Sequence, residues 1–163
     1  MRPPLCGWLI PLQLALVLPA AGCDDDDGHR CVSGRPCPCS GQDLCAVDCS
    51  DLEQCIPVCS SAAECYARCA DDCVFDCSDI SDCGVDCDSR CSVSCERVET
   101  CNATVGPDST VDCSNLTHCQ VQCNGNCVVY CTSLSTCAVT CADGSEATAC
   151  ADGVTRVCET PCP

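Results

Sequence analysis

Apolar and polar residues alternate between residues 45 and 141 in short segments of the form C-x-V-x-C. Polar links of five and three residues separate the segments in turn, which gives an 18-residue repeating unit. Segment starts fall at residues 45, 55, 65, 73, 83, 91, 101, 109, 119, 127 and 137, so after two steps of ten the steps alternate between eight and ten. A fixed internal period of this kind predicts a solenoid or a repeat array.

The central residue of each segment separates strand from helix. The period alone does not, because a repeat of this length also makes five helical turns. On a helix Val85 would point about 200° away from Cys83, toward solvent, whereas on a strand Cys83, Val85 and Cys87 share one face. All 23 cysteines from Cys31 to Cys141 have odd numbers, as a two-residue period requires. Each segment is therefore predicted to be a short strand with its odd residues inward.

The links have the composition of turns. Five-residue links such as Ser50–Gln54 start with a hydroxyl residue and carry one apolar residue, and three-residue links such as Asn124–Asn126 are short and polar. We predict an all-β fold: a short disulfide-stapled β-solenoid with two short strands per 18-residue coil. Five to six coils at about 4.8 Å each give a rod roughly 26 Å long. The alternative is an antiparallel β-meander with one cysteine-covered face.

The predicted architecture resembles that of the insect antifreeze β-helices, which are also compact solenoids stapled by cysteines. Those proteins have shorter coils and outward ladders of Thr-x-Thr. Here the outward pairs are mixed, namely Ala46/Asp48, Tyr66/Arg68, Gly84/Asp86, Asn102/Thr104 and Gln120/Gln122. Ice binding is therefore not expected.

Cysteine content indicates the compartment. The chain has 28 cysteines in 163 residues, a density expected in an oxidising environment. Residues 1–22 read as a signal peptide, with Arg2 before the apolar stretch 5–19 and small residues before Cys23. We expect four parts: the leader 1–22, of the lipoprotein type; an acidic tether and N-terminal cap, 23–44; the cysteine-rich repeats, 45–141; and a disulfide-bonded C-terminal cap, 142–163.

The processing of the leader leaves two alternatives. Signal peptidase could cut after Gly22, or the sequence before Cys23 could act as a bacterial lipobox, although Ala20 stands where Leu is commonest. Removing the leader discards Cys6 and leaves 27 cysteines, whereas lipidation of Cys23 leaves 26, enough for 13 disulfides. The odd number favours lipidation. The run Asp24–Asp27 then becomes a solvated tether.

Two repeat positions that lack cysteine indicate how the other cysteines pair. Val105 and Ser109 occupy cysteine positions of the register and flank one turn, and their joint loss is expected if these two positions normally bond. We predict bridges that close successive turns: Cys49–Cys55, Cys59–Cys65, Cys69–Cys73, Cys77–Cys83, Cys87–Cys91, Cys95–Cys101, Cys113–Cys119, Cys123–Cys127 and Cys131–Cys137. The alternative joins equivalent cysteines of stacked strands, such as Cys73–Cys91.

The net charge and the candidate metal-binding and catalytic residues restrict the classes of function that the sequence allows. A formal charge of −17 disfavours binding to nucleic acid. Thiolate metal binding is not expected, because C-x₂-C is absent and Cys37-Pro38-Cys39 is the one C-x-C. A calcium-binding row is an alternative role for the aspartates crowded into two repeats: Asp71, Asp72, Asp76, Asp79, Asp82, Asp86 and Asp88. Ser114 and His118 lack an identifiable third catalytic group.

We therefore expect no enzymatic activity, no cofactor and no metal site. The expected function is a non-enzymatic structural or adhesion module of a bacterial envelope, anchored in the membrane by lipid on Cys23 or else secreted. Its partner would be an unidentified protein or envelope component, and its location the cell surface or the extracellular space. The alternative is a surface protein that binds divalent cations, calcium above all, through its acidic repeats.

Overall fold

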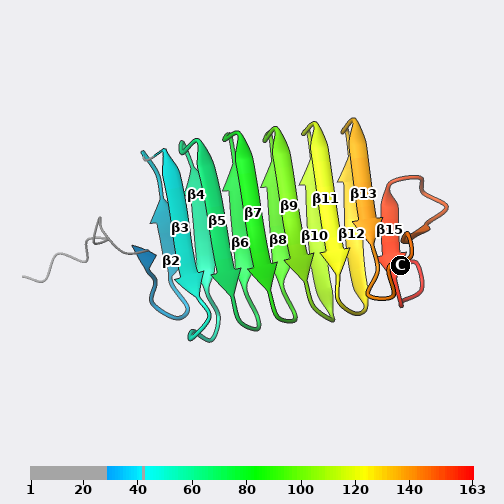
Figure 1. The fold of residues 1–163 in the computed structure, drawn as a ribbon, viewed down its shortest axis with the longest axis horizontal. Helices are drawn as coiled ribbons and strands as arrows, with labels where there is room; N and C mark the ends of the chain where they lie inside the picture. The colour runs from blue at the N-terminus through cyan, green and yellow to red at the C-terminus, as the bar shows by residue number, and fades with distance from the viewer. Residues whose placement is uncertain (1–28, 42) are drawn as a thin grey trace, which may run out of the picture.

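The computed structural model describes residues 29–163 except residue 42. In this part of the chain the backbone forms fifteen strands and no helix. The strands lie side by side along a rod, and the C-terminal hairpin closes one end (Figure 1). The all-β fold expected from the alternating pattern is confirmed.

Two sheets form the sides of the rod. The first sheet contains, in spatial order, β1 (His29–Arg30), β3 (Leu44–Cys49), β5 (Glu64–Cys69), β7 (Asp82–Cys87), β9 (Thr100–Val105), β11 (His118–Cys123) and β13 (Thr136–Thr140). The second sheet contains β2 (Pro36–Cys39), β4 (Ile56–Ser60), β6 (Val74–Ser78), β8 (Ser92–Glu96), β10 (Ser109–Ser114), β12 (Cys127–Thr132), β15 (Thr155–Cys158) and β14 (Thr148–Ala149). Successive strands up to β13 thus alternate between the sheets.

Pairing between coils is parallel from β1 to β13, with equivalent residues opposite one another. Cys101 pairs with Cys119 and Val111 with Val129, each one repeat later, while Cys45 pairs with Cys65 across a slightly longer coil. The β-solenoid is confirmed and the antiparallel meander is wrong. Stacking in the 18-residue register places like residues together, which a meander of neighbouring strands would not do.

Odd-numbered residues face the interior. On β11 the exposed fractions are 1% for Cys119, 1% for Val121 and 0% for Cys123, whereas Gln120 between them is exposed. Phe75 is the one aromatic side chain of the described core, and it is 1% exposed. The core is consequently a narrow layer of cysteine, valine and alanine. The apolar residues of the longer turns, Ile80 and Leu116, are also buried and close its side.

Disulfides join the two sheets across the turns. Nine bridges have Cα–Cα distances of 6.0–6.5 Å, within the range of ordinary disulfides. They are the nine turn-closing pairs given above, Cys49–Cys55 to Cys131–Cys137. Bridges between equivalent cysteines of stacked strands do not occur in residues 29–163. Four further bridges are Cys31–Cys37, Cys39–Cys45, Cys141–Cys158 and Cys150–Cys162.

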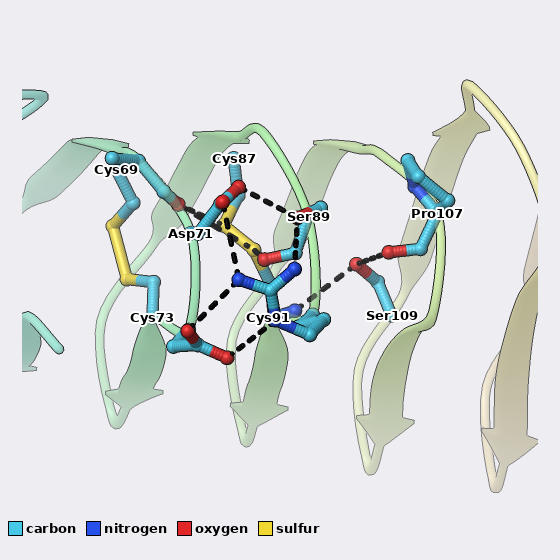
Figure 2. Close-up of a disulfide and its surroundings, with 11 residues drawn as sticks. Cys69, Asp71, Cys73, Cys87, Ser89, Cys91, Pro107 and Ser109 are labelled. Carbon is cyan, nitrogen blue, oxygen red and sulfur yellow. Dashed lines mark hydrogen bonds and ion pairs between the residues drawn. A yellow bond between two sulfur atoms is a disulfide. The ribbon is translucent and has the colours of Figure 1, made fainter. Parts of the chain in front are cut away.

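One turn lacks a bridge but keeps the geometry. Val105 pairs with Cys87 and Cys123, and Ser109 with Cys127. Val105 is 0% and Ser109 2% exposed. The Ser109 hydroxyl accepts a hydrogen bond from the Cys91 backbone N–H at 3.1 Å and donates one to the Pro107 carbonyl at 3.4 Å (Figure 2). Valine packing and a buried hydroxyl thus take the place of the disulfide.

Two rows of left-handed residues shape the turns. Their φ angles lie between 52° and 62°, and they recur once per coil as Gln54, Asp72, Arg90 and Asp108, and as Ser61, Asp79, Arg97, Asn115 and Ser133. This conformation turns the N–H toward the next coil, as in the bonds from Arg90 to Pro107 at 2.9 Å and from Arg97 to Ser114 at 3.2 Å. Asn and Asp tolerate it best among residues with a side chain. The rows therefore tie each turn to its neighbour.

The solenoid begins earlier than the expected boundary at Cys45. β1 and β2 already pair in parallel with β3 and β4, so these two strands contribute the first coil rather than a separate cap. The repeat was hidden there because Cys37 occupies the central position and pairs with Pro57. At the other end β15 pairs antiparallel with β12 and with β14, and this hairpin covers the last coil of the second sheet.

Prolines protect the open edge of the second sheet. Val74 and Ser92 donate their N–H groups to the Cys55 and Cys73 carbonyls of the preceding coil, at 2.9 and 2.8 Å. Pro36 holds the corresponding position on the outermost strand, β2, and Pro38 follows two residues later, so neither residue offers a backbone N–H there. End-to-end addition of another strand is thereby disfavoured.

Reduction is expected to unfold the protein. Each turn-closing bridge closes a loop of about five to seven residues and contributes roughly 2 kcal/mol on the chain-entropy model, so several together exceed the typical stability of a small domain. Circular dichroism with and without reductant at neutral pH measures the effect. A native strand signal that survives complete reduction would contradict this dependence.

The turn without a bridge should accept one. In the double variant Val105→Cys/Ser109→Cys we expect a fourteenth disulfide in the described part, because the neighbouring turns bond the same positions. The free energy of unfolding should rise by about 2 kcal/mol, and thiol titration of the denatured protein should show no new free thiol. Ser109→Cys alone is the control and should show one. Two free thiols in the double variant would refute the register.

Candidate ligand-binding groove

A hollow of about 580 Å³ lies on the outer face of the first sheet. We call it the sheet groove. Even-numbered residues of β3, β5, β7, β9 and β11 contribute its exposed side chains, because the odd ones point into the core. The odd-numbered residues that also border it are buried, namely Val47, Ala67, Val85 and Ala103. The register places the even-numbered residues in two rows that cross the strands. One row is Ala46, Tyr66, Gly84, Asn102 and Gln120, and the other is Asp48, Arg68, Asp86, Thr104 and Gln122.

Tyr66 and Gly84 form the apolar part of the groove. Tyr66 is 47% exposed, and its ring leans toward the neighbouring strand over Gly84, which is buried. A Cβ atom at position 84 would lie 2.3 Å from Cδ1 and 2.6 Å from Cε1 of the tyrosine. Glycine is therefore required if the ring is to occupy this place. Ala46 extends the apolar surface on the other side of Tyr66.

A charged trio lies beside this apolar part. Arg68 pairs in register with Asp48 on one side and Asp86 on the other. The pKa of Asp48 is held below its ordinary value, first by hydrogen bonds from the N–H and hydroxyl of Ser50, at 3.0 and 2.7 Å, and then by the charge of Arg68. Asp48 is thus a carboxylate at neutral pH, and the arginine lies between two acidic neighbours.

The C-terminal half of the groove is polar without formal charge. Asn102 and Gln120 are exposed, Thr104 and Gln122 half-buried. The Gln122 amide donates a hydrogen bond to the Cys141 carbonyl at 3.3 Å, which fixes its direction. Within the described residues, the side chains of Asn102, Thr104 and Gln120 make no hydrogen bond. Their amide and hydroxyl groups can donate and accept toward a ligand.

The acidic repeats lie mainly on the turns, where arginine neutralises part of them. Arg90 binds Asp72 at 2.8 Å and Asp71 at 3.1 Å, and Ser89 donates to Asp71 at 2.6 Å (Figure 2). Arg97 binds Asp79 one coil earlier at 2.7 Å. Guanidinium groups lower the pKa of Asp72 and Asp79, and these carboxylates raise the pKa of both arginines. Sequence reasoning missed these pairs, although the 18-residue spacing of Asp72 and Arg90 and of Asp79 and Arg97 carried the signal.

The remaining aspartates of this cluster are dispersed. Asp76 faces outward on β6 between Val58 and Ser94, Asp82 pairs with Glu64 and Thr100, and Asp86 is in the groove. A metal ion could be held by three or more His, Cys, Asp or Glu ligand atoms within 4.8 Å of one another. In residues 29–163, residue 42 excepted, every such group consists of cysteines. All those cysteines are in disulfides.

Ser114 and His118 lie at the two ends of one longer turn. Ser114 ends β10 in the second sheet, and His118 begins β11 in the first, beside Thr100 and Thr136. Their side chains share no hydrogen bond in the described structure. His118 is exposed on the outer face. The leader 1–22, Cys23 and Asp24–Asp27 lie outside the described residues.

Comparisons of the chain with models of protein families, with curated proteins and with solved structures found no match. The part of the chain that the structure describes contains no helix of the length and hydrophobicity needed to span a bilayer. The groove is thus interpreted from its own geometry and chemistry.

The Asp79–Arg97 pair predicts a pH dependence of stability. Because the folded state lowers the pKa of Asp79 below its ordinary value of 3.8, the stabilisation is fully present above that pH and is lost as the pH falls through the folded pKa. Asp79→Asn should therefore lower the melting temperature at pH 7, and its difference from wild type should shrink as the pH falls through the folded pKa of Asp79. Asp76→Asn removes an equal charge away from arginine and is the control. An Asp79→Asn effect that persists unchanged in acid would contradict the assignment.

Proposed function

We propose that this chain is a non-enzymatic binding module of a bacterial cell surface, held in the membrane by lipid on Cys23 and presenting the sheet groove to an envelope or extracellular partner. The observation that carries the anchoring is the cysteine inventory. The 26 cysteines within residues 29–163 are consumed by 13 disulfides. Cys23 then stays as the one thiol after removal of the leader, and lipidation accounts for it.

The disulfide framework supports an extracytoplasmic location. So many bridges form and persist where thiols are not kept reduced. Bridges at nearly every turn also make the rod rigid, since the two sheets are joined covalently along its length. A rigid scaffold presents a fixed outer face to a partner at low entropic cost.

The distribution of reactive groups supports binding rather than catalysis. A nucleophile needs a base within hydrogen-bond reach and a group that orients this base. The groove offers amides, a hydroxyl, a tyrosine and one arginine between two carboxylates. These groups suit recognition of a polar ligand. Calcium binding is less favoured, because Asp71, Asp72 and Asp79 are already paired with arginine.

Anchoring is tested by fractionation. In Cys23→Ser the protein should move from the membrane fraction to the soluble fraction, because the lipid on Cys23 would provide the membrane affinity. Cys6→Ser is the matched control: it changes the other cysteine outside the 13 bridges, within the leader, and should leave the protein in the membrane. Wild-type protein that is fully soluble, with a mature mass showing unmodified Cys23, would refute the anchor.

A further inference from the structure

We propose that the sheet groove binds a neutral, extended polysaccharide of β-1,4-linked hexoses, which lies along the rod and crosses the strands. The inference rests on the proposed function, because it names the ligand class of the same face. It is carried by three features of the groove: its direction, its apolar end and its uncharged polar end.

The direction of the groove suits a polymer. Its two rows cross β3, β5, β7, β9 and β11, so equivalent positions recur once per coil. Neighbouring strands lie about 4.8 Å apart. A β-1,4-linked hexose chain is a flat ribbon whose residues advance by a similar distance. Successive sugars of one chain can therefore lie over successive coils, with alternate sugars in the same orientation.

The apolar end suits the C–H face of a sugar ring. Tyr66 is 47% exposed, and Gly84 leaves room for its ring to extend over the sheet. Aromatic side chains combine a large apolar surface with a polar tip. Arg68 lies two residues along β5, between Asp48 and Asp86, so planar hydrogen-bonding groups flank the ring on the same face. Such groups can hydrogen-bond to neighbouring hydroxyls of a sugar, because each hydroxyl both donates and accepts a hydrogen bond.

The C-terminal half excludes a charged ligand. The chain carries a formal charge of −17, which repels polyanions, while a polycation would be drawn to the acidic turns rather than to this face. Asn102, Thr104 and Gln120 carry no charge and no hydrogen bond within the described structure, so hydroxyl groups are their natural partners. A peptide strand would need a free sheet edge, whereas the groove is the face of a sheet whose backbone groups are already paired.

Binding is measured by isothermal titration calorimetry of the intact mature protein with two hexamers of glucose. The β-1,4-linked hexamer is extended and should bind, whereas the α-1,4-linked hexamer has the same composition and a curved shape and should bind at least tenfold more weakly. The β-1,4-linked hexamer of N-acetylglucosamine tests tolerance of the 2-substituent. Equal affinity for the α- and β-linked hexamers, or no binding of any hexamer, would overturn the proposal.

Variants locate the site. Tyr66→Ala should weaken binding of the β-linked hexamer roughly tenfold. Gly84→Ala keeps the tyrosine but puts a methyl group where its ring lies, so it should weaken binding comparably. Tyr130→Ala removes a tyrosine from the second sheet and should leave the affinity unchanged. If Tyr66 serves only to cover the backbone at Gly84, all three variants bind equally well, and the proposal fails.

An adherence assay distinguishes failure of the polysaccharide proposal from failure of the proposed binding function. Adherence of cells or vesicles that carry the anchored protein is compared with that of the Tyr66→Ala variant on a surface coated with envelope protein and on one coated with β-1,4-glucan. Loss of adherence to the glucan alone supports the polysaccharide. Loss on the protein surface alone, with no hexamer binding, rejects the polysaccharide but keeps a binding module. Unchanged adherence on both surfaces rejects both.

Discussion

The covalent bond across nearly every turn is the constraint on which the rest of this structure depends. A chain with Phe75 as the sole aromatic residue of its described core cannot be held together by side-chain burial alone. Bridges between adjacent strand ends hold the bonded Cα atoms 6.3 Å apart, as in Cys77–Cys83 and Cys113–Cys119, and so join the two sheets. Inward positions are thereby fixed, and outward positions are free to vary, which allows one face to become a binding surface.

Much of the fold was predictable because the cysteine positions follow the strand period and the pairing across the turns. Their odd numbering indicated the strand period, and the joint loss at Val105 and Ser109 indicated the pairing across turns. The first coil escaped prediction, since Cys37 stands in a central position that valine usually holds. The groove escaped as well: its residues were known only as mixed outward pairs. Its shape depends on how Tyr66 leans over Gly84, which no spacing in the sequence encodes.

Charge is divided between the surfaces of the rod. Carboxylates gather at the turns, where Arg90 and Arg97 bind those of the preceding coil. The C-terminal half of the sheet groove has none. The acidic turns keep the rod soluble and disfavour polyanions, and the two prolines of β2 disfavour growth at its open edge. Both features leave the outer face of the first sheet as the surface for which we propose a binding role.

Tryptic digestion without reduction tests the turn-closing bridges most directly. Cleavage after Arg30 and Arg68 yields the segment 31–68, whose bridges from Cys31–Cys37 to Cys59–Cys65 are all internal. The account predicts that this segment is released as a separate mass by unreduced, mildly denatured protein. Pairing of stacked cysteines would link Cys49 to Cys69 and Cys59 to Cys77. A segment 31–68 that stays attached to 69–90 until reductant is added would contradict the account.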